Sequence, residues 1–383
     1  MLGASAPMRR ASGVWGVTLP GGGAVLSHPD RGRLFLLNHP AHLLWRALRV
    51  IDAARLTDVL VSRYGLPLEI AERDVSAIVS QWIDNGLAIF ADGRHDNSSG
   101  RDMPASEPPA VGARGKISFY RFASLVVGLS ADSSFHVAIA PLIAHLQIAD
   151  AKPDMICVIG QSRADRRFLA VDGRVAVDDA EDNVVIGAFF QAVLERLHPG
   201  AQWRAFMHAA AVARNGVVAI FPAPAGNGKS TLSAYLVARG YQYFSDDVVP
   251  LLMEGDAVAP FPLPTSVKPG SASVLARHYL ALNGGERSEP QYLVHDTSFS
   301  ARPAQARALI FPRYLPGAPT RFEPLSVTDA MARLLSDRLY LGYPIEPAAV
   351  RGFADWLGRV RRYELIYSEI EEAERCVSQA LTT

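Results

Sequence analysis

Cysteine is nearly absent from this chain, which has only Cys157 and Cys376 among its 383 residues. Two cysteines so far apart cannot form the closely spaced pairs of a zinc site, and they are too few for a disulfide framework. We therefore interpret each cysteine as a small apolar core residue. The same scarcity favours a reducing compartment, so we expect a cytoplasmic protein.

Long apolar runs are also missing. No stretch approaches the roughly 18–20 apolar residues that a membrane-spanning helix needs. Arg9 and Arg10 lie near the beginning of the sequence, but the apolar segment of a secretory signal does not follow them. We expect a soluble intracellular protein without a membrane partner.

A net charge is missing as well, because 38 Lys and Arg residues balance 38 Asp and Glu residues. This balance removes the basic excess that is typical of a general nucleic-acid binder, so we expect no nucleic-acid partner. What the sequence does have is apolar residues, at 49% of the chain. That share is ample for sizeable cores, and the length favours two or three domains.

The sequence changes character at residues 92–114, where a polar stretch with glycine at 91–100 is followed by Pro104, Pro108 and Pro109. Such a segment cannot bury enough apolar surface to offset the entropy of ordering it, so we interpret it as a linker. The prediction is a small domain at 12–91 and a larger domain at 115–383.

The smaller domain is predicted to be an α+β unit. Glycine-rich and proline-containing turns separate three short β-like runs at 14–19, 24–27 and 33–37. Apolar residues at helical spacing then predict three helices at 42–50, 53–64 and 70–85, and 87–90 could form a last strand. Residue types that carry catalysis do not cluster in this winged-helix-like unit, so we interpret it as a binding module.

The larger domain is predicted to be of the α/β class. Helices are expected at 136–146 and 183–197, a strand-rich segment at 117–129, and short strands at 155–160, 167–171 and 174–177. Asp172-Gly173 between the last two strands is a strong hairpin signal. Further on, a turn at Asn215-Gly216 precedes an apolar strand at 217–221.

The central motif follows that strand directly. Residues 223–231 read Ala-Pro-Ala-Gly-Asn-Gly-Lys-Ser-Thr and match G-x-x-x-x-G-K-[ST] except for Ala223 at the first position. Glycines let backbone N–H groups converge on an anion, and the predicted helix at 230–239 directs the positive end of its dipole at the phosphates. The sequence thus predicts ATP and Mg²⁺ as cofactors. The residues expected to bind the nucleotide are Ala225, Gly226, Asn227, Gly228, Lys229, Ser230 and Thr231.

Acidic residues end the next predicted strand, where 241–245 runs into Asp246-Asp247. Carboxylates placed there can handle Mg²⁺ or deprotonate a nucleophile, although a solvated turn would also explain them. His208 precedes the loop strand, and a histidine beside an apolar run is more often structural. Lys268, in a predicted polar loop at 264–270, and Arg313, after a predicted strand at 308–311, could touch phosphates or substrate, or lie solvated at the surface.

The stretch 208–250 resembles the HPr kinase/phosphorylase superfamily, relatives of phosphoenolpyruvate carboxykinase. The shared order is a histidine, a strand, a Gly-x-Gly-Lys-Ser loop, a helix that ends in glycine, and a strand that ends in Asp-Asp. The loop is most similar to HPr-kinase-like proteins of peptide biosynthesis, where Pro-Ala-Pro-x-Gly-x-Gly-Lys-Ser-Thr-Leu is common, so Ala223 is a family trait. The resemblance extends over about 115–383 and implies a P-loop kinase domain.

This resemblance also implies roles for the residues. Asp246 would be the general base, Asp247 would assist Mg²⁺ together with Ser230, and His208 would stabilise charge near the acceptor. The candidate catalytic residues are therefore Asp246, His208, Lys229 and Asp247, with Lys268 and Arg313 as phosphate or substrate contacts. Which aspartate is the base stays open. No equivalent of the phosphorylase-specific segment is present, which argues against HPr as the substrate.

Residues 12–91 resemble the PqqD-like domain, the element that recognises ribosomally made and modified peptides. The resemblance rests on the order of strands and helices and on the ending Trp82-Ile-Asp-Asn-Gly-Leu87. In that family a leader peptide adds as a strand beside the third strand and packs on the last helix. Here this places the precursor peptide at 33–37 and on one face of 70–82.

Together, the two resemblances imply a kinase that phosphorylates a Ser or Thr hydroxyl of a leader-bound precursor peptide. By similarity to kinases of lasso-peptide clusters, a C-terminal serine is one candidate acceptor. A kinase of a small-molecule hydroxyl and an inactive, nucleotide-regulated binding protein are the alternatives. The presence of Lys229, Ser230, Asp246 and Asp247 together counts against the inactive protein. Superfamily members often form oligomers, and the number of subunits stays open here.

Overall fold

The computed structural model describes residues 8–28, 33–48, 53–90, 116–163, 166–279, 282, 290–295, 302–342 and 345–382. The predicted linker at 92–114 and the turn expected at 29–32 lie outside these residues. No helix within the described ranges is long and apolar enough to cross a membrane.

Two compact units make up the chain. The first unit comprises Met1–Asp102, Ala308–Phe311 and Arg321–Leu365, and the second comprises Met103–Arg307, Pro312–Thr320 and Ile366–Thr383. Each is described by itself below, and the limits 12–91 and 115–383 stay predictions.

The first unit contains a three-stranded antiparallel sheet in the order β2-β3-β4. Its strands are β2 (Trp15–Thr18), β3 (Ala24–His28) and β4 (Arg33–Leu37), close to the predicted runs. Val25 of β3 pairs with Val17 on one side and with Leu36 on the other. Only β3 lies between two strands, so β4 is the terminal strand of this sheet.

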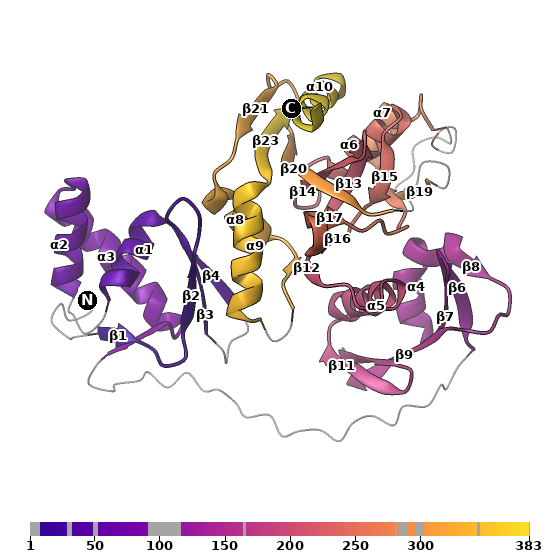
Figure 1. Ribbon diagram of the computed structural model, residues 1–383, viewed down its shortest axis with the longest axis horizontal. Coiled ribbons are helices and arrows are strands. Elements are labelled where there is room, and N and C mark those ends of the chain that lie inside the picture. Colours follow the sequence, from indigo (N-terminus) through magenta and orange to yellow (C-terminus); the bar gives the residue numbers. More distant parts are fainter. Residues whose placement is uncertain are drawn as a thin grey trace. The chain divides into compact units, whose positions relative to one another are not determined.

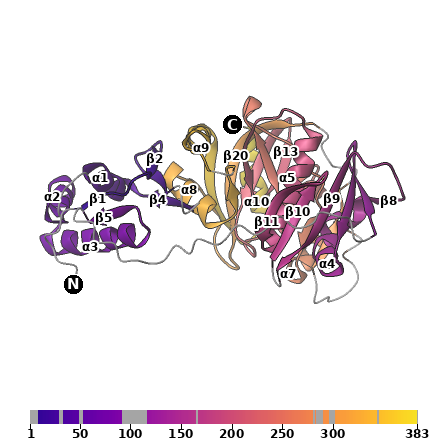
Figure 2. The same ribbon diagram turned by 90° about the horizontal axis from the view of Figure 1, so that it is seen from below.

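Three helices share an apolar core with this sheet: α1 (His39–Ala47), α2 (Ala53–Tyr64) and α3 (Leu68–Asp84) (Figure 2). Helix α1 begins earlier than predicted because the Asn38 side chain caps it by accepting from the Ala41 N–H. The rings of Trp45 and Trp82 meet edge to face, with centroids 5.2 Å apart. This contact joins α1 to α3 in the core.

Strand β1 (Met8–Arg10) was not predicted from the sequence. It pairs antiparallel with β5 (Ala88–Phe90), so the two ends of this module lie side by side. Arg10 then reaches α1, where its guanidinium donates to the Trp45 carbonyl at 2.5 Å and lies over the Trp45 ring. The strand is only three residues long, so its pairing with β5, the burial of Met8 in the core and the contacts of Arg10 with α1 together stabilise it.

A segment from near the end of the chain completes the first unit. Helix α8 (Val327–Ser336) packs against β4, and α9 (Pro347–Arg359) packs against β2. Two glycines make the approach close, since a Cβ on Gly23 would lie 2.9 Å from the Thr328 hydroxyl and one on Gly358 would lie 3.0 Å from Pro20. The remaining elements of this segment are β21 (Arg321–Pro324), β22 (Leu339–Tyr340) and the first five residues of β23 (Arg361–Tyr367).

The second unit begins with a six-stranded sheet in the order β11-β10-β9-β7-β6-β8. Helices α4 (Ser133–Ile143) and α5 (Asp182–Leu197) share its apolar core, and the short η2 (Ala144–Leu146) follows α4 (Figure 1). Asp172 and Gly173 both have positive φ, as the predicted hairpin turn requires. The strands are β6 (Ser118–Phe122), β7 (Leu125–Ala131), β8 (Gln147–Ile148), β9 (Met155–Arg163), β10 (Arg166–Val171) and β11 (Arg174–Ala180).

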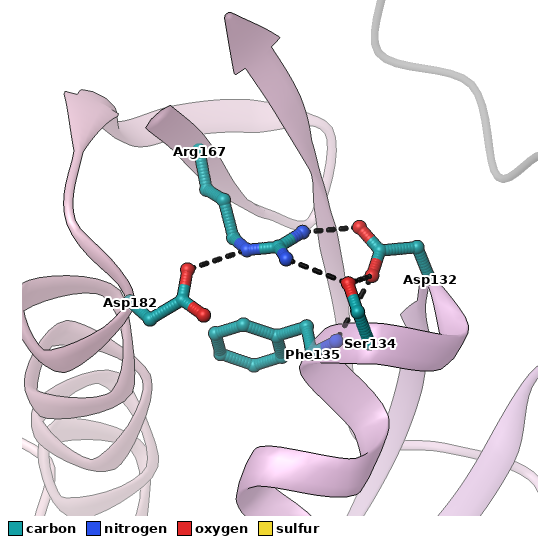
Figure 3. Close-up of polar contacts among 5 residues, drawn as sticks. All are labelled: Asp132, Ser134, Phe135, Arg167 and Asp182. Carbon is teal, nitrogen blue, oxygen red and sulfur yellow. Dashed lines mark hydrogen bonds and ion pairs between the residues drawn. The ribbon is translucent and has the colours of Figure 1, made fainter. Parts of the chain in front are cut away.

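Arg167 of β10 joins the first turns of α4 and α5, as Figure 3 shows. Its guanidinium bonds to Asp132, the N-cap of α4, and to Asp182 at the start of α5, the latter at 2.6 Å. It also donates to Ser134 at 2.9 Å. Both carboxylates lie at helix N-termini, where negative charge is favourable, so the arginine stabilises the two helix ends together.

A larger sheet carries the phosphate-loop motif. Strand β13 (Ala209–Arg214) lies between β14 (Val217–Pro222) and β15 (Gln242–Ser245) and is antiparallel to both. The predicted strand at 308–311 is only the middle of β20 (Ala304–Tyr314), so Arg313 lies inside the strand and not after it. The other strands of this sheet in the second unit are β12 (Trp203–Met207), β16 (Val249–Leu252) and β17 (Ala257–Val258).

Helices α6 (Lys229–Ala238), α7 (Pro269–Leu275) and α10 (Ile370–Thr382) belong to the same unit, and both α7 and α10 contact α6. The predicted polar loop at 264–270 instead contains β18 (Thr265–Val267), which pairs with β19 (Gln291–Leu293). The short η3 (Glu254–Asp256) lies between β16 and β17.

Candidate functional site

The sheet topology brings three predicted parts of the site to one edge: the phosphate loop, the Asp246-Asp247 pair and His208. Because β13 is antiparallel to both neighbours, β14 and β15 are parallel to each other and end at the same edge where β13 begins. The phosphate loop follows β14, Asp246 and Asp247 follow β15, and His208 directly precedes β13. The strands β13, β14 and β15 lie beside α6 in Figure 1, and residues up to 39 positions apart, such as His208 and Asp247, therefore come into contact.

The loop between β14 and α6 is shaped by two glycines in the left-handed region. Gly226 has φ 94° and Gly228 has φ 87°, and Gly228 is the N-cap of α6. A Cβ on Gly226 would meet open space, whereas one on Gly228 would lie 2.6 Å from the Tyr367 hydroxyl. The N–H groups of the first turn of α6 lack partners within the helix, so this end of the helix favours an anion.

Lys229 opens α6 with a side chain that is only 8% exposed. Its ammonium nitrogen lies 3.5 Å from Oδ1 of Asp247. The next two side chains differ, since Ser230 is partly exposed while the Thr231 hydroxyl donates to Ser271 of α7 at 2.6 Å. Ser230 is therefore the hydroxyl that the geometry leaves at the site, and Thr231 joins α6 to α7.

Asp247 has φ 65°, a left-handed conformation that aspartate tolerates better than most residues. Oδ1 of its carboxylate accepts from Nε2 of His208 at 3.3 Å and also contacts Lys229. Burial raises the pKa of Asp247, but the hydrogen bond from His208 and the charge of Lys229 outweigh this effect. The pKa of Asp247 is therefore below its ordinary value, and the group is held as a carboxylate.

Asp246 lies in a different environment, with no solvent exposure. Oδ2 accepts from the Ser266 N–H at 3.4 Å, and within the described residues Oδ1 has no partner in hydrogen-bond geometry, although the nearby Ser230 hydroxyl lowers the pKa. Burial, followed by the charge of Asp247, raises the pKa of Asp246 to about 7, against the opposing charge of Lys229. Two adjacent aspartates thus have pKa values that shift in opposite directions, which makes this cluster a candidate functional site.

The two other predicted cations are not part of this cluster. Lys268 and Arg313 are both exposed, and in the portion of the chain that the structure describes neither forms a hydrogen bond or ion pair with these residues. Lys268 directly follows β18, whose Ser266 contacts Asp246, and Arg313 directly precedes Tyr314, whose N–H donates to Asn227 of the loop. Each is one or two residues from a contact with the site.

Two residues at the site, Ser266 and Tyr367, were not predicted from the sequence. Ser266 lies in the predicted polar loop at 264–270 that also contains Lys268, so the polar Ser266 side chain could have been proposed as a site residue. Tyr367 closes on Gly228 from 139 positions away, and its hydroxyl lies 3.5 Å from the Gly228 carbonyl. No local pattern announces that contact, because long-range packing alone creates it.

A metal ion and ATP can be tested against this geometry. No group of three or more His, Cys, Asp or Glu side chains suited to a metal occurs in the described residues. Mg²⁺ in phosphoryl-transfer sites needs only one or two protein oxygens, since substrate phosphates and water supply the rest. The Ser230 hydroxyl and the Asp247 carboxylate are the oxygens that fit this role, and the glycine loop with its open side at Gly226 fits the phosphates.

Comparison with protein families matches residues 23–88 to the family described as "Coenzyme PQQ synthesis protein D (PqqD)". These residues run from the turn before β3 into β5, and the PqqD-like module predicted from the sequence is confirmed over them. A search of curated proteins found no match.

Among solved structures, the chain is similar to the "Hpr(Ser) kinase/phosphatase from Coxiella burnetii". The sequence identity is 14%, and the match covers 45% of this chain and 94% of that one, with a TM-score of 0.21.

Proposed function

We propose that this protein transfers the γ-phosphoryl group of ATP to a Ser or Thr hydroxyl of a ribosomally made precursor peptide. The observation that carries the proposal is the environment of Asp246. This buried carboxyl has a pKa raised to about 7 and an Oδ1 atom without a partner in hydrogen-bond geometry among the described residues, and it lies beside the Lys229–Asp247 ion pair. A general base that works near neutral pH needs these properties.

The phosphate loop supplies the donor half of the reaction. Backbone N–H groups around Gly226 and Gly228, the N-terminus of α6 and the Lys229 ammonium hold the phosphates. When bound, Mg²⁺ neutralises charge on the phosphates, and Ser230 and Asp247 are the residues that would hold it. Asp247 suits this role because His208 and Lys229 keep it ionised.

Asp246 supplies the acceptor half. Oδ1 takes the proton of the attacking hydroxyl while a bond forms between that oxygen and the γ-phosphorus. The bond from the γ-phosphorus to the bridging oxygen breaks, and ADP leaves with the electron pair. The products are a phosphorylated peptide, ADP and a protonated Asp246, which loses its proton to water. Asp246 is the better base of the two aspartates because Asp247 is already engaged by two cationic or donor groups.

The PqqD-like module supplies the peptide. Its terminal strand β4 has backbone groups that a leader can pair with by strand addition. We expect the leader also to contact α3, on which Ile70 is an exposed apolar side chain. A leader held in this way raises the local concentration of the core peptide at the kinase site.

Intact-mass spectrometry tests the proposal. The protein would be incubated with ATP, Mg²⁺ and candidate precursor peptides, taken from short reading frames near its gene. The expected result is an increase of about 80 Da in the peptide, the mass of one phosphoryl group. Asp246→Asn should lower the rate by at least about 100-fold, the usual contribution of a general base.

Asp355→Asn is the matched control, since it makes the same chemical change at an exposed aspartate of α9. This variant should retain the wild-type rate. If the protein binds ATP but the peptide remains unmodified, the peptide-kinase proposal is wrong. If Asp246→Asn and wild type have equal rates, Asp246 is not the general base.

A further inference from the structure

An exposed tyrosine lies at the phosphate loop without an assigned role. Tyr314 is the last residue of β20, and it is 47% exposed. Its backbone N–H donates to the Asn227 carbonyl of the loop at 3.2 Å. Tyr314 is thus hydrogen-bonded to the loop through its backbone, while about half of the residue is exposed to solvent.

The backbone around Tyr314 is held in place from several sides. Leu315 N–H donates to the Tyr367 carbonyl at 2.9 Å, and Gly317 N–H donates to the Ser368 hydroxyl at 3.0 Å. The segment cannot swing away from the loop without breaking these bonds. The backbone that carries the exposed ring is therefore preorganised, and preorganisation lowers the entropic cost of binding a ligand.

Close packing also fixes the ring against the start of α6. The Tyr314 ring meets the Tyr367 ring edge to face, with centroids 5.7 Å apart. A Cβ on Gly228 would come within 3.3 Å of the Tyr314 Cβ, so the base of this side chain touches the loop glycine. Tyr314 therefore contacts both Tyr367 and the loop glycine, and it still remains partly exposed to solvent beside the phosphate loop.

A nucleotide extends beyond its phosphates to a ribose and a flat aromatic base. The loop, Lys229 and Ser230 account for the phosphates only, while Tyr314 offers an aromatic surface next to them. We propose that Tyr314 stacks on the purine base of the nucleoside triphosphate and holds it beside the loop. This inference rests on the proposed function, because it presupposes that the loop binds a nucleotide.

Isothermal titration calorimetry with two probes tests this role. ADP carries a base and tripolyphosphate does not, so a stacking residue affects only ADP. Tyr314→Ala should weaken ADP binding by about 5- to 100-fold, the range seen when a stacking aromatic is replaced by alanine. Its affinity for tripolyphosphate should stay within about twofold of wild type, because the phosphate contacts are unchanged.

Three further variants sharpen the test. Tyr314→Phe keeps the ring and should bind ADP like the wild type. Tyr314→Leu keeps apolar volume against Tyr367 but has no aromatic face, so it should lose affinity for ADP alone, even if Tyr314→Ala fails to fold. Tyr64→Ala removes a tyrosine of comparable exposure from α2 in the first unit and should change neither probe.

The outcomes separate this inference from the proposed function. Unchanged ADP affinity in Tyr314→Ala and Tyr314→Leu would overturn the stacking role and leave the kinase proposal standing. Equal losses for ADP and tripolyphosphate would also overturn it, since the ring would then only support the loop. Failure of the wild type to bind either probe would overturn both proposals.

Discussion

At the scale of single residues, Asp246 and Asp247 show how neighbours in sequence acquire opposite chemistry. Asp246 is fully buried, with its pKa raised to about 7. Asp247 has a side chain that is 35% exposed and contacts His208 and Lys229, and its pKa is lowered. Burial disfavours the charged form and dominates at Asp246, whereas the donors and cations in contact with Asp247 favour the charged form there. One aspartate is thus poised to exchange a proton and the other to remain an anion.

The pH dependence of catalysis follows from this difference. A base acts only when it is deprotonated, so kcat/KM should rise with pH and level off above a midpoint near 7, the pKa of Asp246. Steady-state kinetics from roughly pH 5.5 to 8.5, the range over which such a group titrates, would measure this midpoint. A flat profile over this range would argue against Asp246 as the base.

The same pKa predicts a pH dependence of stability. The folded state keeps the Asp246 proton at pH values where the unfolded chain, with an ordinary aspartate pKa of 3.8, has released it. The free energy of unfolding contributed by this group therefore falls as pH rises from about 4 to about 7. Relative to wild type, Asp246→Asn should become more stable as pH rises through this window. Urea unfolding at several pH values would check this, and a constant difference would contradict it.

His208 should act through Asp247 and not on the nucleotide itself. Its Nε2 lies 3.3 Å from Asp247 Oδ1. We expect His208→Ala to increase the Mg²⁺ concentration needed for half-maximal activity by about 10-fold, the lower end of the range for partners that orient metal ligands. Binding of tripolyphosphate without Mg²⁺, measured by calorimetry, should stay near wild type. A large loss in that measurement would instead place His208 at the phosphates.

At the scale of elements, the two ends of α6 depend on glycines, because the backbone there has a positive φ. Gly228 and Gly240 bound α6 and have nearly equal φ values of 87° and 88°. A Cβ on Gly240 would meet open space, whereas a Cβ on Gly228 would meet the Tyr367 hydroxyl at 2.6 Å. An alanine at Gly240 would therefore suffer only backbone strain, whereas an alanine at Gly228 would suffer the same strain and also a clash with Tyr367.

This pair gives a prediction with an internal control. Gly240→Ala should lower the free energy of unfolding by about 1–2 kcal/mol, the cost of a left-handed residue with a Cβ. Gly228→Ala should cost more, because Tyr367 must also move. Removing the hydroxyl in Gly228→Ala/Tyr367→Phe should recover part of the additional loss. Chemical denaturation would measure all three, and equal losses at the two glycines would show that Tyr367 does not constrain the loop.

At the scale of the whole molecule, the proposal joins a peptide-binding module to a kinase site. If the module between β1 and β5 binds the leader, the benefit is one of effective concentration and not of altered chemistry. A precursor with its leader should therefore be phosphorylated with a kcat/KM about 100-fold or more above that of the core peptide alone. At saturating core peptide, kcat should be similar for the two substrates.

Peptide controls keep this prediction specific. A precursor with a scrambled leader should behave like the core peptide, and free leader added separately should inhibit the intact precursor by competition. The full-length protein is used throughout, since α8 and α9 pack on the sheet of the module and a truncation would expose that surface. Equal kcat/KM for all peptides would exclude a leader-binding role.

Much of the local structure could be predicted from the sequence. The strands β2 to β4, the bounds of α2 and the hairpin at Asp172-Gly173 agree closely with the sequence pattern. The glycine-rich turn from β14 into α6, which stays a predicted phosphate loop, could be located for the same reason. Glycine conformations, helix caps and apolar periodicity depend on residues a few positions apart, so the sequence alone determines them.

Contacts between distant residues were decided only by the tertiary structure. The pairing of β1 with β5, the packing of α8 on β4 and the closure of Tyr367 on Gly228 leave no local pattern. The sequence named His208, Lys229, Asp246 and Asp247 one by one, but the position of β13 between β14 and β15 brings them to one edge and divides the two aspartates into a buried acid and a paired anion. Burial and long-range pairing depend on the whole fold, because they arise when segments far apart in the chain exclude water together.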